Sequence, residues 1–213
     1  MTEPADEKRA AARAAAELVE HGMLVGLGTG STVAELLPAL AERELSLRCV
    51  ATSVATEEQA RELGIPVEPF ESIDRLDIAI DGADQIAPDG WLVKGGGGAH
   101  VREKIVAAAA DRFVVIADSS KPVGEIAAPI PLELLRYGID ATLRRLGEAD
   151  LRDVPASPDD GLIADYRGEV GDPGELAARL AAMPGVVDHG LFEPALTATI
   201  LVAHGSEIDC RNL

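Results

Sequence analysis

The sequence predicts an α/β protein in which helices cover both faces of a parallel sheet, with a smaller α+β unit in the second half of the chain. Three observations support this. Up to Lys121, short apolar segments alternate with segments of helical spacing, as in parallel sheets. The apolar segments near Val25, Ile78 and Val115 alternate little, as burial on both faces requires. Beyond Pro122, prolines interrupt the chain and its character changes.

The first half of the chain supplies the main sheet in order. Residues 1–20 resemble an Ala-rich amphipathic helix. Met23 to Leu27 forms a strand that ends in a glycine-rich turn, and Thr32 to Leu40 continues with helical spacing. The alternation then recurs, with strands expected at 48–51, 77–80 and 113–117 and helices at 56–63 and 101–110.

The second half is expected to form the smaller unit. Leu132 to Leu146 has a helical pattern, and strands are expected at 161–166 and 186–191 around a helix at 174–182. Thr197 to Ala203 is a β-branched apolar run that could return to the main sheet. We therefore expect a main domain of residues 1–127 plus 199–213 and a smaller domain of residues 128–198.

Composition excludes several classes of protein. The 213 residues are 47% apolar and 26% charged, which fits a folded domain, and with 3% aromatics the core must be built from Ala, Val, Leu and Ile. A net charge of −18 disfavours nucleic acid and anionic membranes as partners. No apolar run reaches about 18 residues and no signal peptide is recognisable, so we expect a cytoplasmic protein.

Metal and thiol chemistry have little support in the sequence. The two cysteines, Cys49 and Cys210, have no CxxC spacing, and the histidines show no ligand spacing. We therefore expect free thiols, no metal and no cofactor.

The segment from Gly26 to Thr32, GLGTGST, joins a predicted strand to a predicted helix. Its glycines, the helix N-terminus and the hydroxyls of Ser31 and Thr32 suit a phosphate cradle. It matches neither the dinucleotide fingerprint nor the P-loop. The alternative is a tight turn in which Ser31 caps the helix.

Two further segments carry candidate groups. Asp81-Gly82-Ala83-Asp84 follows a buried strand, where two carboxylates could face one pocket or simply terminate the strand in a polar turn. Four glycines follow Lys94, and such a run suits a loop that wraps closely around a ligand, although a flexible surface hairpin is the alternative.

Glu103 lies at the start of the helix after the glycine run. The helix dipole favours a carboxylate there, so Glu103 is either a simple first-turn residue or, beside Lys94, a candidate base. Asp118-Ser119-Ser120-Lys121 follows another apolar strand. The chain has fifteen arginines but only four lysines, and Lys94, Lys104 and Lys121 lie in or beside these segments.

Taken together and in this order, GLGTGST, DGAD, KGGGGAxxREKI and DSSK resemble the type A ribose-5-phosphate isomerases. The later PGVVxxGLF segment, residues 184–192, agrees. The resemblance implies a Rossmann-like main domain with a smaller α+β domain, and a homodimer or homotetramer. The sequence departs from the family pattern at residues 54–57, at His100 and at residues 131–137.

The resemblance also implies an activity and a set of site residues. The activity is the interconversion of ribose 5-phosphate and ribulose 5-phosphate in the pentose phosphate pathway. It makes Glu103 the proton acceptor, assisted by Lys94, Asp81 and Asp84. Substrate contacts are implied for Lys8, Thr29, Gly30, Ser31, Thr32, Asp81, Gly82, Ala83, Asp84, Lys94, Gly95, Gly96, Gly97 and Lys121.

We expect the reaction to pass through a cis-enediolate, with Glu103 moving the proton between C2 and C1. Two alternatives stay open at this point. One is a sugar-phosphate sensor like the effector domains of some bacterial repressors. The other is a related enzyme such as an amino-sugar phosphate deaminase, a lactonase or a CoA transferase.

Overall fold

The computed structural model describes residues 3–213, which divide into two compact units. Unit 1 comprises the chain up to Ala83 together with Arg102–Lys121 and Ala195–Leu213. Unit 2 comprises Asp84–Val101 and Pro122–Pro194. The domain limits expected from the sequence, residues 1–127 plus 199–213 and residues 128–198, stay a prediction.

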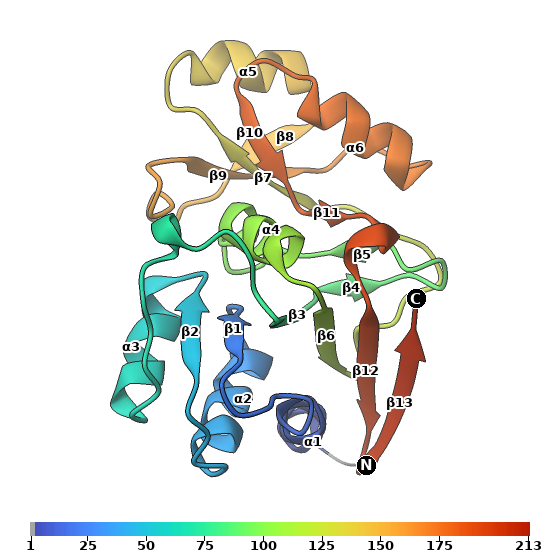
Figure 1. The fold of residues 1–213 in the computed structure, drawn as a ribbon. Helices are drawn as coiled ribbons and strands as arrows, with labels where there is room; N and C mark the ends of the chain where they lie inside the picture. The colour runs from blue at the N-terminus through green and yellow to red at the C-terminus, as the bar shows by residue number, and fades with distance from the viewer. Residues whose placement is uncertain (1–2) are drawn as a thin grey trace. The chain divides into compact units, whose positions relative to one another are not determined.

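Unit 1 is built on a six-stranded sheet in the order β13-β12-β6-β3-β1-β2 (Figure 1). Neighbouring strands run parallel except β13, which is antiparallel to β12, so the predicted parallel sheet is confirmed. The segment expected to return to this sheet does so as β12. The strands are β1 Leu24–Leu27, β2 Arg48–Ala51, β3 Ile78–Gly82, β6 Phe113–Asp118, β12 Thr199–His204 and β13 Glu207–Asn212.

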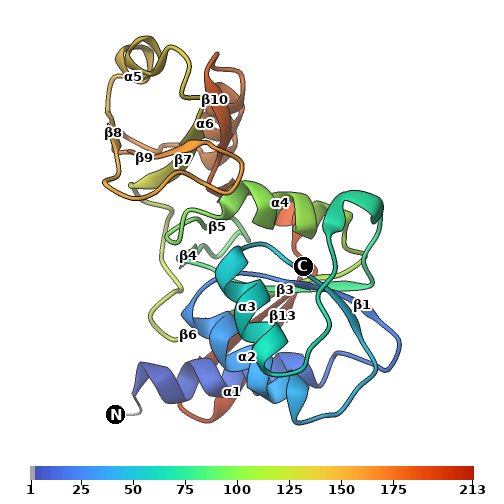
Figure 2. The same ribbon diagram turned by 90° about the vertical axis from the view of Figure 1, so that its left-hand side faces the viewer.

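Helices cover both faces of this sheet. The side chains of Val25 and Leu27 in β1 belong to the core cluster that contains the alanines of α1. Gly26 between them faces the opposite side, where a Cβ would meet Val106 of α4. Figure 2 shows α1 and α2, which pack together. The helices are α1 Pro4–Ala16, α2 Ser31–Ala41, α3 Val54–Glu62 and α4 His100–Ala109, with 3-10 turns η1 Phe70–Ser72 and η2 Pro194–Leu196.

The core of unit 1 is built from small and aliphatic side chains. Four alanines of α1, at positions 11, 12, 15 and 16, are fully or almost fully buried. Small side chains on this face let α1 approach α2 and β6 closely. A core of this kind fits the low aromatic content of the sequence, 3%.

Unit 2 contains two antiparallel sheets. One has the order β10-β7-β9-β8, and the other has the order β11-β5-β4. Its strands are β4 Gln85–Ile86, β5 Leu92–Val93, β7 Ile130–Leu134, β8 Ala149–Leu151, β9 Leu162–Tyr166, β10 Val186–His189 and β11 Leu191–Phe192, and its helices are α5 Ile139–Leu146 and α6 Pro173–Ala181. Leu132, Leu134 and Leu176 lie in its apolar core.

One element expected from the sequence is wrong. The segment Leu132 to Leu146 is not one helix, because its first residues form β7, which pairs with both β9 and β10. Its leucines favour a helix locally, but cross-strand pairing buries Leu132 and Leu134 completely. Gly138, with φ of 72°, then starts the shorter helix α5.

Within residues 3–213, the structure contains no helix that combines the length and the apolar character required to cross a membrane.

Candidate active site

In unit 1 the sequence-predicted segments lie at the carboxyl ends of parallel strands. The loop Gly28–Gly30 follows β1, Asp81 and Gly82 end β3, and Asp118 ends β6. Because carboxyl ends of parallel strands share one edge of a sheet, these segments lie at the edge where ligands bind in such folds.

The carboxylate of Asp81 holds the loop after β1. It is 3% exposed, and its Oδ1 accepts hydrogen bonds from the backbone N–H of Thr29 at 3.1 Å and of Gly82 at 2.7 Å. A Cβ on Gly28 would overlap this carboxylate, so the close approach requires glycine. Asp81 therefore shapes the loop as well as ending its strand.

Two threonines that the sequence reasoning missed complete this loop. The hydroxyls of Thr29 and Thr52 lie 2.7 Å apart, and Thr56 Oγ1 donates to the carbonyl of Gly28 at 2.9 Å. Both Thr52 and Thr56 are buried. Thr52 follows β2 directly, at the same sheet edge, and Thr56 lies in the first turn of α3; this position after a parallel strand is the signal that could have identified them.

The start of α2 has the features of an anion site. Gly30, with φ of 122°, is the N-cap residue, and no side chain caps the helix, so the capping role considered for Ser31 is not observed. The first turn contains no acidic residue, and its N–H groups have no acceptor within the helix. Thr32 in this turn is 8% exposed.

A lysine from α1 reaches this helix start. Lys8 Nζ donates to Ser31 Oγ at 3.0 Å and lies 4.0 Å from Asp118 Oδ2. The contact places a cation beside the first turn of α2. Lys121 lies in the turn after β6, where its backbone N–H donates to the carbonyl of Asp118, and it is half-buried.

Glu7 ties α1 to the same region. Its Oε2 accepts from the hydroxyl of Ser119 at 2.6 Å and from the Ser119 N–H at 3.0 Å, and its Oε1 accepts from the N–H of Gly205 at 2.9 Å. The hydroxyl of Ser119, followed by these backbone donors, lowers the pKa of Glu7 from 4.5 to about 2. Sequence reasoning missed Glu7, whose partners lie far along the chain.

The lowered pKa of Glu7 predicts an acid-sensitive link. The ionised form is bound better in the folded chain, so its stabilisation is complete above pH 4.5 and is lost as the pH falls towards 2. We expect Glu7→Gln to lower the melting temperature at pH 7, by an amount that shrinks between pH 4.5 and 2. Asp6→Asn, which alters an exposed neighbour, is the control. Equal pH profiles for wild type and Glu7→Gln in thermal unfolding would contradict this prediction.

Glu103 lies in the first turn of α4 and is 4% exposed. The helix dipole stabilises a carboxylate in this turn whether it is buried or exposed, and other positions of the same helix are exposed to solvent. Ile105, two residues on, is 53% exposed. A burial of this depth distinguishes Glu103 from an ordinary first-turn glutamate on a helix surface.

In unit 2, Lys94 follows β5 directly and is 2% exposed. Its backbone N–H donates to the carbonyl of Gly190 at 2.8 Å, which fixes the start of the glycine run. Its Nζ lies 5.5 Å from the centre of the Phe192 ring, within range of a cation–π interaction. Burial of a lysine is costly, so its position indicates a specific role.

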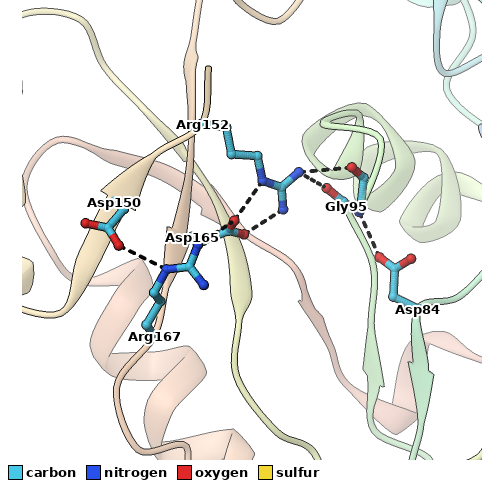
Figure 3. A network of polar contacts seen from close by, with 7 residues as sticks. Asp84, Gly95, Asp150, Arg152, Asp165 and Arg167 are labelled. Carbon is cyan, nitrogen blue, oxygen red and sulfur yellow. Dashed lines mark hydrogen bonds and ion pairs between the residues drawn. The ribbon is translucent and has the colours of Figure 1, made fainter. Parts of the chain in front are cut away.

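The glycine run forms a shaped loop. Gly95 and Gly98 have φ of 105° and 74°, and the Gly98 N–H donates to the Gly95 carbonyl at 3.0 Å. A Cβ on Gly95 would lie 2.7 Å from His100 Nδ1. The exposed Asp84 accepts from the N–H of Gly96 at 2.7 Å (Figure 3). These contacts favour a fixed loop over a flexible hairpin. Ala83, between β3 and β4, is half-buried, and Gly97 is exposed.

The next features are the cysteine thiols and the potential metal ligands, within the part of the chain that the structure describes. Burial, followed by the charge of Glu68, raises the pKa of Cys49 to about 12, so its thiol stays protonated at neutral pH. Among residues 3–213, no group of three or more His, Cys, Asp or Glu side chains is placed to hold a metal ion.

Comparison with known proteins identifies the family. The family model described as ribose 5-phosphate isomerase A (phosphoriboisomerase A) matches residues 48–207. The chain belongs to this family. A curated ribose-5-phosphate isomerase A from Caulobacter sp. (strain K31) is 46% identical over 202 residues, covering 88% of this chain and 89% of that protein.

Solved structures agree with the family assignment. The ribose 5-phosphate isomerase A of Neisseria gonorrhoeae has a TM-score of 0.94 at 30% identity, covering 100% of this chain and 98% of the other. A D-ribose-5-phosphate isomerase solved in complex with phospho-erythronic acid has a TM-score of 0.93 at 29% identity, covering 99% and 100%. The expected fold class is therefore confirmed.

A second family model, the DeoR C terminal sensor domain, matches residues 3–65. This segment contains α1, the GLGTGST loop and α2. It stops before Asp81, Lys94 and Glu103, so the similarity to the sensor domain covers the loop and not the other candidate residues.

Proposed function

We propose that this chain interconverts D-ribose 5-phosphate and D-ribulose 5-phosphate, as in the non-oxidative branch of the pentose phosphate pathway. The family match over residues 48–207 carries the proposal, because this range includes DGAD, the glycine run and Glu103. The match with the Caulobacter protein covers 88% of this chain and 89% of that protein, which supports the same activity for the whole chain.

The substrate phosphate binds at the start of α2. The N–H groups of the first turn, the hydroxyls of Ser31 and Thr32 and the ammonium of Lys8 form a local positive site. Local donors are needed because the protein as a whole carries a charge of −18 and repels a dianion at long range.

Glu103 is the base. It removes the C2 proton of the open-chain aldose to give a cis-enediolate and returns a proton at C1, so one carboxylate serves both steps. Burial of Glu103 slows exchange of the abstracted proton with bulk water between the two transfers, so only part of it is exchanged in each turnover.

Lys94 and the backbone N–H groups of the glycine loop stabilise the charge that develops on O1 and O2. The ammonium of Lys94 is buried, where a charge acts more strongly than in water. Asp81 and Asp84 assist ring opening or move hydroxyl protons, and Gly82, Ala83, Gly95–Gly97, Thr29, Gly30 and Lys121 complete the substrate contacts.

The remaining parts of the proposal concern the protein as a whole. It acts in the cytoplasm as a homodimer or homotetramer and needs neither a metal nor a cofactor.

The test is an assay of wild type with ribose 5-phosphate in the presence and absence of EDTA, with product measured as ribulose 5-phosphate. We expect turnover that the chelator does not change. Saturable binding of ribose 5-phosphate without turnover would instead support a sensor, the role suggested by the match over residues 3–65.

A further inference from the structure

Arg152 lies directly after β8 and connects that strand to the glycine loop (Figure 3). Its Nη1 donates to the carbonyl of Gly95 at 2.9 Å and to the carbonyl of Gly96 at 3.0 Å. Its Nε and Nη2 donate to the two carboxylate oxygens of Asp165 at 3.1 and 2.6 Å. One guanidinium therefore joins a carboxylate of β9 to two consecutive carbonyls of the loop.

The Arg152–Asp165 pair is largely shielded from water. The two side chains are 18% and 12% exposed, and the backbone N–H of Arg152 is also fixed, by the carbonyl of Ile163 at 2.9 Å. A two-point contact with the carboxylate sets the plane of the guanidinium, which directs Nη1 at the loop. A lysine has no such planar fork and could not make all four contacts.

These contacts fix the orientation of two peptide planes. In a trans peptide the carbonyl and the N–H point in opposite directions. Arg152 binds the carbonyl between Gly95 and Gly96, while Asp84 accepts from the Gly96 N–H of the same peptide at 2.7 Å. This plane is thus held at both ends.

The next peptide plane is held by its carbonyl. Arg152 binds the Gly96 carbonyl, so the Gly97 N–H of that peptide points away from the guanidinium. A cation on the carbonyl also polarises the peptide and strengthens its N–H as a donor. Glycine without such a contact would sample many orientations, since it has the greatest backbone freedom of any residue.

We propose that Arg152, held by Asp165, is a positioning residue that orients the Gly97 N–H of the glycine loop for the enediolate. The inference rests on the proposed isomerase function. Arg152 does not touch the reacting atoms; it fixes the peptide whose N–H does. Its loss raises the energy of the charged intermediate more than that of the bound sugar, so kcat falls and KM changes little.

The test compares Arg152→Gln and Arg152→Lys with the control Arg167→Gln. Arg167 pairs with Asp150 at 2.9 Å and with the same Asp165 at 3.8 Å, and neither of these partners belongs to the glycine loop. We expect kcat to fall about 30- to 100-fold in Arg152→Gln and about 10-fold in Arg152→Lys, with KM within about threefold. Arg167→Gln should keep kcat within about twofold of wild type.

Inhibition by phospho-erythronic acid supplies a second readout. Its carboxylate is an anionic group in place of a neutral sugar carbonyl, so its affinity depends on the hydrogen-bond donors of the loop. We expect its inhibition constant to rise about 10-fold in Arg152→Gln, while a purely structural role of Arg152 would leave it unchanged in the folded fraction. Asp165→Asn should act in the same direction, and Arg152→Gln combined with Asp165→Asn should be no worse than Arg152→Gln alone.

The outcomes separate two failures. A folded Arg152→Gln protein with wild-type kcat and inhibition constant would overturn this inference and leave the isomerase function intact. If Arg152→Gln does not fold, Arg152→Lys, which keeps the charge, decides in its place. A wild-type protein without turnover would overturn the proposed function, and this inference with it.

Discussion

Glu103→Gln is expected to lower kcat about 10²- to 10⁴-fold, the contribution typical of a positioned general base. The amide keeps the size of the side chain but cannot accept the C2 proton. KM should stay within about threefold, because the change acts on proton transfer and not on the phosphate contacts. Steady-state kinetics with ribose 5-phosphate, alongside thermal unfolding, measures both effects.

The matched control is Glu175→Gln. Glu175 also lies in the first turn of a helix, α6, so its replacement removes a carboxylate at a comparable place in a helix dipole. We expect wild-type kcat for Glu175→Gln. Near-normal turnover by a folded Glu103→Gln protein would reduce Glu103 to an ordinary first-turn residue.

Lys94→Met is expected to lower kcat by about 10²-fold or more, because it removes the buried positive charge assigned to the enediolate oxygens. The variant should remain folded, so that the fall in kcat reports on the chemical step and not on unfolding. Kinetics and chemical denaturation on one preparation measure the two quantities.

Lys104→Met is the control for the loss of a lysine. Lys104 lies in α4 and is half-buried, and it has no role in the proposed chemistry. Its replacement should leave kcat within about twofold of wild type. If Lys94→Met matched Lys104→Met in kcat, the proposed charge stabilisation would be wrong.

Local sequence patterns predicted the main sheet because its strands are short apolar runs buried on both faces. The strands near Val25, Ile78 and Val115 all occur in the structure as β1, β3 and β6. The segment from Leu132 failed, because its leucines suit either a helix or a strand and pairing with β9 and β10 decides between them. Such pairing cannot be read from a local pattern.

The residues of the candidate site likewise fall into those that the sequence predicted and those that it could not predict. Glycine runs and rare lysines stand out in the sequence, so the segments around Gly28 and Lys94 could be selected from it. Arg152 could not be selected, because it is one of fifteen arginines and its contacts with Gly95 and Asp165 depend on how β8 pairs with β9. Glu7 was missed for the same reason, since its partners Ser119 and Gly205 are distant along the chain.

The most direct test of the account is solvent exchange during turnover. Wild type is incubated with ribose 5-phosphate in D₂O, and the hydrogens at C1 of ribulose 5-phosphate and C2 of ribose 5-phosphate are followed by NMR spectroscopy. Proton transfer through Glu103 predicts that deuterium appears at these carbons over many turnovers, and that Glu103→Gln abolishes this incorporation. Complete retention of the C2 hydrogen at C1 of the product would indicate a hydride shift and contradict the assignment of Glu103 as the base.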